Sequence, residues 1–400
     1  MKDKEVTFVT NLPIWSIAEG VGAPSMYLTL QAYLSSFNKI NYISTESNFR
    51  KNNYNFASMY DLNKFCLLKM KNPLLRRLVK YPNWLFLNII VLILLFWKRP
   101  RGIIYTYEIF FVPATKLYTC LTNDTILITR FQGTILGDVS TLTPLGRFTK
   151  FFRKFDHFVA LKIKSDLIIM TDDGTEGDRV LKYLRNASKT LFIKNGVGWP
   201  DTIPICGIDH HAHLSRNTDM SDTDNANINF YTCCRLNSWK RVDRAIEFFK
   251  KVSDEEPRAH LNIIGDGPEL KNLVKQVQYL GIDAKVSFAG AIPQYELTQY
   301  VKDMDFFISF YELSNVGNPL WEAIITNAKV ITISNGDTDK YISNLQNGFI
   351  QPENKYLDNA DNVIKFIKGE ICLIEKPTLP SDVVSWAGRL SNEIQMVSSL

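Results

Sequence analysis

Short apolar runs alternate with amphipathic stretches through the second half of the chain. Each run has the length of a buried strand, and each stretch repeats its apolar residues at helical spacing, as Val242 to Val252 does. The expected strands are 229–233, 260–264, 285–288, 305–310 and 329–333, and the expected helices are 242–252, 269–280, 295–302 and 319–326. This alternation predicts a doubly wound parallel sheet.

The first half predicts a second sheet of the same kind. Its expected strands are 6–10, 40–44, 102–106, 125–129, 166–170 and 190–193. Several are continuous apolar runs, which is typical of parallel strands covered by helices on both faces. The polar stretch 214–228 is the predicted linker between domains at 1–213 and 229–375. The fold class is therefore α/β, with two Rossmann-like domains whose ligands should bind at the carboxyl ends of the strands.

Composition narrows the class of protein. Hydrophobic residues make up 46% of the chain and charged residues 22%, which excludes a mostly disordered chain. The six cysteines are too scattered for a disulfide scaffold, and the chain opens without a secretory apolar segment. These features predict a cytoplasmic protein.

Charge is unevenly distributed between the halves. Residues 1–200 hold 27 Lys or Arg against 14 Asp or Glu, whereas residues 201–400 hold 19 against 27. Within 39–101 there are 12 basic and two acidic residues, and 84–97 is an apolar stretch with Trp at both ends. Its 14 residues are short for a membrane span, so it is either a buried helix or a helix lying in a membrane interface, and the two can coexist. A peripheral contact with anionic membrane is therefore expected, and no nucleic-acid module is recognisable.

Two loops after predicted strands have residues suited to a phosphorylated ligand. Arg235 and Lys240 follow strand 229–233 with four residues between them, which suits a diphosphate, although a solvated loop explains them equally well. Gly265 and Gly267 form a turn before a helix, where glycines allow close backbone approach; a simple tight turn is the alternative.

A third loop follows strand 305–310. Gly317 and Asn318 precede a helix that has Pro319 in its first turn, as in an anion-binding helix start. Glu322 falls about one turn into that helix, where its carboxylate could accept hydrogen bonds from two ribose hydroxyls.

These three loops, in this order, resemble the retaining glycosyltransferases of family 4, which have the two-Rossmann GT-B fold. In that family the Arg and Lys of an R-x4-K loop hold the donor diphosphate, and they match Arg235 and Lys240. The second glutamate of a later motif binds the ribose and matches Glu322. The donor-binding residues that the resemblance implies are Gly20, Gly22, Gly265, Gly290, Ser314, Gly317, Asn318 and Glu322.

The resemblance is weaker in the N-terminal half. Gln132 and Gly133 stand where many members have a His-Gly pair near the transferred sugar, and Asn195-Gly196-Val197 resembles an interdomain element. Residues 376–400 resemble the C-terminal segment whose helix crosses back to the first domain. Gln132, Gly133 and, from its sequence context, His157 are the candidate sugar or acceptor contacts.

The chain departs from the family at its sugar-binding end. Ser314 stands where the first glutamate is usual, and the nearest carboxylate, Glu312, is two residues too early. Gln132 replaces the usual His, and Gly198 replaces the usual Asp. These departures point to a changed donor or acceptor.

No metal cofactor is expected. Asp303-Met304-Asp305 has the D-x-D form of metal-dependent glycosyltransferases, but it enters a strand instead of leaving one. Cys206, with His210, His211 and His213, lacks a Cys-x-x-Cys half. The cations and helix dipoles can neutralise a diphosphate without a metal.

The function expected from the resemblance is a retaining hexosyltransferase. It would move a sugar from a nucleotide-diphosphate donor to a glycan or lipid-linked acceptor in surface polysaccharide or glycolipid assembly, at the inner face of the cell membrane. A catalytically weak homologue that binds or scaffolds is the alternative, because of Ser314. The absence of a G-x-G-x-x-G motif after the first predicted strand argues against a nicotinamide oxidoreductase.

Overall fold

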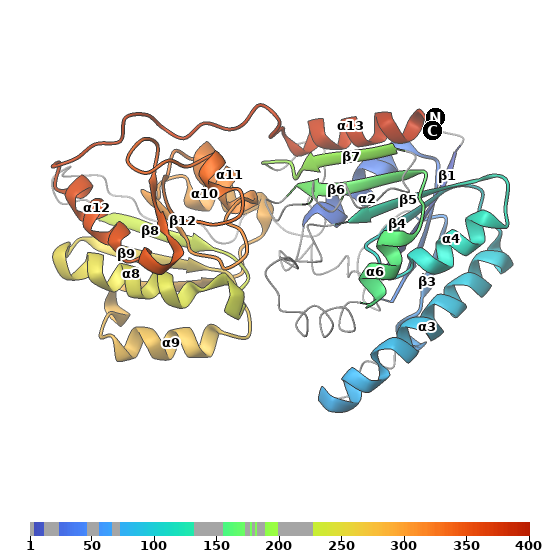
Figure 1. Cartoon of the computed structure of the whole chain (residues 1–400), viewed down its shortest axis with the longest axis horizontal. Coiled ribbons are helices and arrows are strands. Elements are labelled where there is room, and N and C mark those ends of the chain that lie inside the picture. The colour runs from blue at the N-terminus through green and yellow to red at the C-terminus, as the bar shows by residue number, and fades with distance from the viewer. Residues whose placement is uncertain are drawn as a thin grey trace, which may run out of the picture. The chain divides into compact units, whose positions relative to one another are not determined.

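The computed structural model describes two compact α/β units. It covers residues 4–11, 24–45, 56–65, 73–131, 155–172, 177, 181, 189–198 and 227–400. The N-terminal unit consists of Met1–Asn195, Pro200–Ile203 and Val384–Leu400, and the C-terminal unit consists of Gly196–Trp199 and Pro204–Val383 (Figure 1).

The N-terminal unit contains a seven-stranded sheet in the order β3-β2-β1-β4-β5-β6-β7. All pairings in it are parallel. Its strands are β1 (Glu5–Thr10), β2 (Lys39–Ser44), β3 (Ser58–Asp61), β4 (Gly102–Tyr107), β5 (Thr125–Phe131), β6 (Leu167–Asp172) and β7 (Lys189–Lys194). Six of these were predicted. The short edge strand β3 was missed because Ser-Met-Tyr-Asp has no apolar run.

Helices cover both faces of this sheet: α2 (Pro24–Ser36), α3 (Pro73–Lys98), α4 (Val112–Cys120) and α6 (Phe155–Lys162). Alternate residues of a strand point to opposite faces. Val9 of β1 packs in the core beneath α3 and α4, while its neighbour Phe8 packs against Tyr33 of α2 at 5.2 Å between ring centroids. The sheet is therefore buried on both sides, as its continuous apolar strands predicted.

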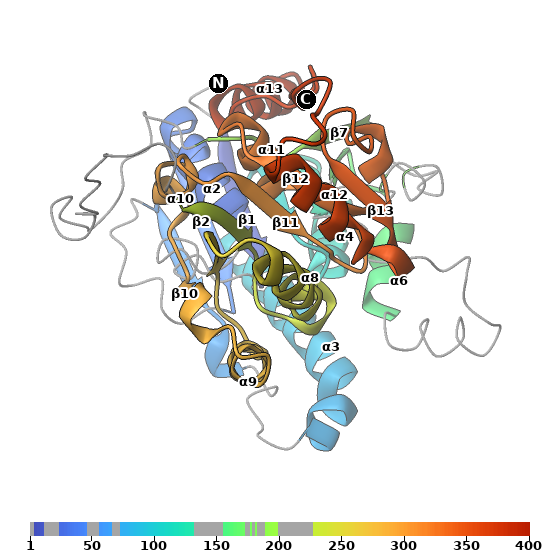
Figure 2. The same cartoon turned by 90° about the vertical axis from the view of Figure 1, so that its left-hand side faces the viewer.

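The C-terminal unit contains a six-stranded parallel sheet in the order β10-β9-β8-β11-β12-β13. Figure 2 shows this unit facing the viewer. The strands are β8 (Ile228–Cys233), β9 (Ala259–Ile264), β10 (Val286–Gly290), β11 (Phe306–Ser309), β12 (Lys329–Ser334) and β13 (Phe349–Pro352). The helices are α8 (Val242–Glu255), α9 (Leu270–Tyr279), α10 (Gln294–Val301), α11 (Asn318–Ile325) and α12 (Asp358–Ile367). The strand β13 was not predicted; it begins directly after a glycine turn.

The amphipathic pattern of α8 explains how this unit packs. Ala245, Phe249 and Val252 lie on one face of the helix and are buried in the core of the sheet. Beneath them the rings of Phe230 and Phe306, from the neighbouring strands β8 and β11, stack at 4.6 Å. The apolar spacing of α8 thus fixes which face meets the sheet.

The last helix, α13 (Trp386–Ser398), belongs to the N-terminal unit and packs against α2. Its Glu393 is fully buried and accepts a hydrogen bond from Tyr105 at 2.7 Å. The same carboxylate pairs with Arg389 at 2.8 Å and with Arg130 of β5 at 3.4 Å, and both guanidinium groups are buried. Burial opposes ionisation of Glu393, but the two guanidinium groups hold its pKa below the usual value.

We predict that Glu393→Gln lowers the free energy of unfolding by ~3–5 kcal/mol, because it leaves two buried guanidinium charges without a carboxylate. The depressed pKa means that this contribution is present above the ordinary pKa of glutamate and is lost as pH falls through the folded value. Urea unfolding at neutral and acid pH measures both effects. Glu255→Gln breaks an exposed pair with Lys368 and should change stability by less than ~1 kcal/mol. Equal losses in the two variants would contradict the prediction.

Candidate functional site

The loops that follow β8 and β9 and the last residue of β10 are joined by backbone hydrogen bonds at the carboxyl edge of the C-terminal sheet. Cys234 N donates to Ile264 O at 3.0 Å, and Leu236 N donates to Asp266 O at 2.9 Å. Gly265 N donates to Gly290 O at 2.7 Å. Two loops and the end of a third strand, distant in sequence, are therefore held side by side.

Two glycines are required for this close approach. Gly265 has a φ of +132°, and a Cβ there would lie 1.9 Å from the carbonyl oxygen of Cys234. A Cβ at Gly267 would lie 2.4 Å from the carbonyl oxygen of Leu236. Backbone carbonyl groups of the protein itself thus lie against both glycines, as expected for a simple tight turn. The assignment of Gly265 to the donor site stays a prediction.

Arg235 and Lys240 both lie in the loop after β8, at this carboxyl edge. The Arg235 side chain is exposed. Lys240 ends a short helical turn, Ser238–Lys240, and its Nζ lies 3.6 Å from the ring centroid of Tyr311 and 4.2 Å from that of Trp239. Contacts between an ammonium group and aromatic faces stabilise and orient the cation. The loop after β11, which contains Tyr311, therefore positions Lys240.

Side-chain amides hold the loop after β11 in place. Asn315 is buried, and its Oδ1 accepts a hydrogen bond from Tyr311 N at 2.9 Å. Its Nδ2 donates to Asn335 Oδ1 at 2.7 Å, and Asn335 in turn donates to Tyr311 O. Ser314 is also buried, and its Oγ accepts from Val316 N at 3.1 Å. Ser314, which stands where the family usually has a glutamate, thus lies in a loop held by several hydrogen bonds.

The helix α11 begins where the third motif predicted. Gly317 is its N-cap in extended conformation, and a proline follows in the first turn. Asn318 Nδ2 donates to the carbonyl of Gly196 at 3.1 Å, and Val197 packs in the same core as Leu320. The Asn-Gly-Val element is therefore attached to the start of α11, whose amide groups favour an anion.

Glu322 is the buried carboxylate of this edge, with 2% of its surface exposed. The residues around it in α11 are apolar and buried, and Gln294 of α10 donates a hydrogen bond to its Oε1. Burial raises the pKa of Glu322 to about 8, and the bond from Gln294 acts in the opposite direction. At neutral pH a large fraction of this group is therefore protonated.

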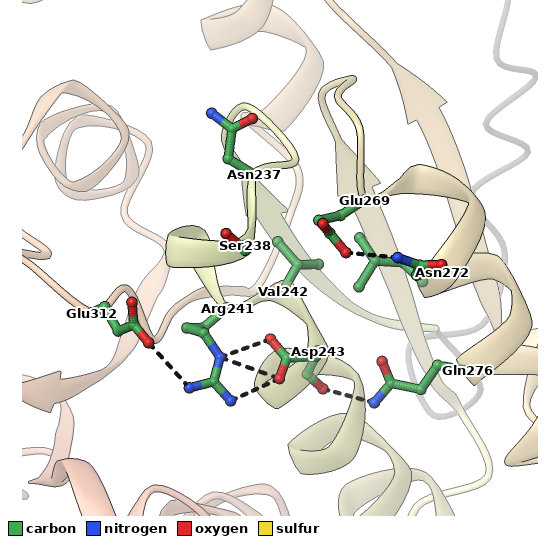
Figure 3. Close-up of a pocket in the computed structure, with 10 residues that line it drawn as sticks. Asn237, Ser238, Arg241, Val242, Asp243, Glu269, Asn272, Gln276 and Glu312 are labelled. Carbon is green, nitrogen blue, oxygen red and sulfur yellow. Dashed lines mark hydrogen bonds and ion pairs between the residues drawn. The ribbon is translucent and has the colours of Figure 1, made fainter. Parts of the chain in front are cut away.

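A cavity of about 400 Å³ lies on the α8 and α9 side of the same loops (Figure 3). Arg241, which has a φ of +47°, bonds Asp243 at 2.8 Å and lies 3.5 Å from a carboxylate oxygen of Glu312. Two carboxylates neutralise this cation, so the cavity is not suited to a phosphate. Glu312, the carboxylate nearest to Ser314 in the sequence, therefore pairs with Arg241 and lines this cavity.

Of the candidate residues in the N-terminal half of the chain, His157 is the one that the structure describes. Gly20, Gly22, Gln132 and Gly133 lie outside the described residues, as do Cys206 and the histidines near it. His157 lies on α6, where its Nδ1 is 3.4 Å from Asp156, which also pairs with Lys80 of α3 at 3.2 Å.

The D-x-D segment enters a strand in the structure, as the sequence predicted. Asp305 directly precedes β11, and its Oδ2 accepts from Asn229 N at 2.8 Å, at the amino end of the sheet. In the part of the chain that the structure describes, no group of three His, Cys, Asp or Glu side chains could hold a metal.

Sequence reasoning missed three residues that shape the site. Gln294, Arg241 and Asn315 act on residues distant in sequence, Glu322, Glu312 and Asn335 respectively. For Asn315 a signal existed, because Asn after a strand often bonds nearby backbone. Nothing local marks the other two.

Solved structures show the class of fold. Sucrose-phosphate synthase of Thermosynechococcus elongatus superposes with a TM-score of 0.68 at 11% identity, covering 99% of both chains. HepE of Anabaena, solved in complex with UDP and glucose, superposes with a TM-score of 0.63 at 13% identity and covers 99% of this chain and all of its own. The chain therefore has the GT-B fold of two doubly wound α/β units, as predicted.

The family is indicated by the C-terminal unit. The family model described as "Glycosyl transferases group 1" matches residues 222–378. Alpha-monoglucosyldiacylglycerol synthase of Streptococcus pneumoniae is 33% identical over 111 residues, which are 28% of this chain and 24% of that relative. Residues 222–378 thus match a glycosyltransferase family model, and the match to the pneumococcal relative spans about a quarter of that relative's length.

We predict that the burial of Glu322 makes the stability of the ligand-free protein pH-dependent. A carboxyl pKa raised on folding contributes stability below its unfolded value, and that contribution is lost as pH rises through the folded value of about 8. Between pH 5 and 8, the unfolding free energy of wild type should fall relative to Glu322→Gln by up to ~1.4 kcal/mol per pH unit. Denaturant unfolding across this range measures it, with the exposed Glu370→Gln as control. Parallel pH profiles for wild type and Glu322→Gln would contradict the prediction.

Proposed function

We propose that the protein is a retaining glycosyltransferase of family 4 that uses a nucleotide-diphosphate sugar. One observation is central. Arg235, Lys240 and the ribose-matching Glu322 belong to one edge of a parallel sheet, within the segment that matches the glycosyltransferase family model. Two cations suit a diphosphate, and a buried carboxylate suits ribose hydroxyls.

The proposed reaction breaks the bond between the anomeric carbon and the diphosphate. The acceptor oxygen forms a new bond to that carbon on the same face, and the leaving phosphate takes the acceptor proton. Arg235 and Lys240 stabilise the charge that develops on the diphosphate, aided by the amides at Gly317 and Asn318. Such fixed electrostatic stabilisation needs no metal and is the largest contribution in many enzymes.

Ribose binding by Glu322 is coupled to its proton. The ionised carboxylate is an acceptor on both oxygens, whereas the protonated form carries an O–H donor on one oxygen and is the weaker acceptor. Since burial raises the pKa of this group to about 8 in the empty site, we expect donor affinity to increase from pH 6 to pH 9. Gln294 donates a hydrogen bond to Glu322 Oε1, which holds the side chain in position.

The similar proteins suggest which donor and which acceptor to test first. HepE was solved with UDP-glucose, which makes UDP-glucose the first donor to test. The name of the pneumococcal relative is that of a glucolipid synthase, which favours a lipid acceptor such as diacylglycerol for this chain. We propose that the protein acts at the cytoplasmic face of the membrane, in glycolipid or surface polysaccharide assembly.

Ser314 favours a second candidate function. With serine in place of the first family glutamate, the chain could be a catalytically weak homologue that binds a nucleotide sugar and serves as a subunit. Donor binding without hydrolysis or transfer, across UDP-, GDP-, ADP- and TDP-sugars, would favour this alternative.

We predict that Arg235→Ala and Lys240→Ala each reduce sugar transfer by ~10²-fold or more, as expected on losing one fixed donor to the leaving group. Lys275→Ala removes an exposed cation from α9 and is the matched control, which should retain activity. Initial rates of release of the nucleoside diphosphate measure the effect. Near-normal turnover in both loop variants would remove the diphosphate assignment.

We also predict that at pH 9, where Glu322 is ionised, Glu322→Gln weakens nucleotide binding by ~10-fold or more, because it removes hydrogen bonds to a charged acceptor, whereas Ser314→Ala has a smaller effect. Calorimetric titration with UDP distinguishes the two. Ser314→Glu is the inverse test, and activity gained on a hexose donor would show that this position sets donor choice. Unchanged affinity in Glu322→Gln would disprove the ribose role.

A further inference from the structure

The helix α3 has a wide apolar face that the described residues of the N-terminal unit leave exposed. We call the exposed face of α3 the six residues Leu85, Phe86, Ile89, Ile93, Phe96 and Trp97, whose exposed fractions run from 40% to 69%. At ~100° per residue they share an arc of roughly 120° on one side of the helix. Figure 1 shows α3 along an edge of its unit, beside α4.

This face also lacks charge. Between Lys80 and Lys98 the sequence contains no Asp, Glu, Lys or Arg. Helices that face water normally have charged side chains on the outer side. The apolar surface extends sideways, because Phe65 is 36% exposed and lies 6.5 Å from Phe86, edge to face. A contiguous apolar surface of this kind marks a contact site.

The opposite face of α3 is fixed to the protein. Leu87, Val91 and Leu95 are buried in the core with strand residues. Asn88 is buried too: its Nδ2 donates to Phe110 O at 3.0 Å, and its Oδ1 accepts from Ala114 N at 3.2 Å.

These contacts decide between spanning and lying on a membrane. By length and composition the 20 residues Val79–Lys98 could cross a bilayer, but a third of this stretch is buried in the unit. Spanning would remove Leu87 and Val91 from the core and break the bonds of Asn88. The helix therefore meets a bilayer from the side, with its axis along the surface.

Cations border the exposed face of α3. Lys98 Nζ lies 3.7 Å from the ring centroid of Trp97, and Lys64 Nζ lies 5.0 Å from that of Phe65. Arg99 and Arg101 are exposed next to the end of the helix. Among the ion pairs of the described residues, none involves these four cations.

This charge pattern favours a lipid surface over a second copy of the chain. Anionic headgroups would complement the cations while acyl chains receive the apolar residues. A second copy would present the same face, which has no carboxylate between Lys80 and Lys98. Exposed tryptophan at the edge of the apolar face is typical of the membrane interface.

We propose that the exposed face of α3 docks the N-terminal unit on an anionic bilayer, with the helix lying in the interface and Lys64, Lys98, Arg99 and Arg101 meeting the headgroups. This docking does not depend on the transfer chemistry. Together with the proposed function, it would bring the transferase to an acceptor held in lipid.

The first test is sedimentation with vesicles that contain phosphatidylglycerol. Wild type should bind at low salt and be partly released at high salt, since headgroup attraction is screened and apolar insertion is not. Ile89→Glu with Ile93→Glu should weaken binding by ~10-fold or more, because charged side chains enter the apolar layer unfavourably. The matched control is Ile374→Glu, at an exposed isoleucine of the C-terminal unit. Both variants should retain wild-type affinity for UDP, which separates this test from that of the donor site.

Tryptophan fluorescence tests the orientation. Trp97 is 69% exposed, so lipids brominated near the headgroup should quench its emission, and Trp97→Phe should abolish that quenching. Trp239→Phe, in the other unit, should not. In the Trp97→Phe background, Ile89→Trp should be quenched by shallow bromines more than by bromines at the ends of the acyl chains.

Three results would overturn the proposal. Wild type could remain in the supernatant with anionic vesicles at low salt. It could instead self-associate in solution without binding vesicles, and become monomeric in the Ile89→Glu, Ile93→Glu variant, which would assign the face to a second copy. Strongest quenching of Ile89→Trp by bromines at the bilayer centre would show that the helix spans.

Discussion

The parallel order of the strands in the C-terminal unit is the constraint on which the candidate site depends. Parallel strands all end at one edge, so the loops after β8, β9, β10 and β11 meet there although more than 70 residues separate Arg235 from Gly317. Backbone hydrogen bonds join the first two of these loops to each other and to the end of β10, and only glycine fits at 265 and 267. This edge of the sheet sets the position of every residue of this unit that is assigned to donor binding.

Glu322 shows how the site differs from an ordinary core. A carboxyl group in an apolar helix lowers stability when ionised, and one hydrogen bond from Gln294 only partly offsets the lost hydration. A ligand that donates two hydrogen bonds to this group would relieve the cost. This destabilising placement supports the proposed binding role of Glu322, because strongly shifted carboxyl groups often mark functional sites.

The N-terminal unit departs in two ways from the usual arrangement of an apolar core and a charged surface. It buries the charged cluster of Glu393, Arg130 and Arg389, which attaches the last helix to the sheet, and it leaves six large apolar side chains of α3 exposed. In the first, the Glu393 carboxylate pairs with both guanidinium groups and so offsets part of the cost of burying them, although each arginine keeps two buried nitrogen atoms without a hydrogen-bond partner in the described structure. The exposed apolar side chains have no such partners among the described residues of the unit, and the proposed lipid interface would cover them.

The sequence by itself determined the fold class, because the alternation of apolar runs with amphipathic stretches permits few arrangements other than parallel doubly wound sheets. It also singled out Arg235, Lys240 and Glu322, since cations after a strand and a carboxylate in an apolar helix are visible locally. It missed β3, whose four residues pair only because β2 offers an open edge. The hydrogen bond from Gln294 to Glu322 and the pairing of Arg241 with Glu312 join elements far apart in the chain. The 84–97 stretch left two interpretations open, and only packing showed that one side of α3 is core and the other is uncovered. Local patterns fix which elements form, whereas contacts between distant segments exist only once the chain has folded.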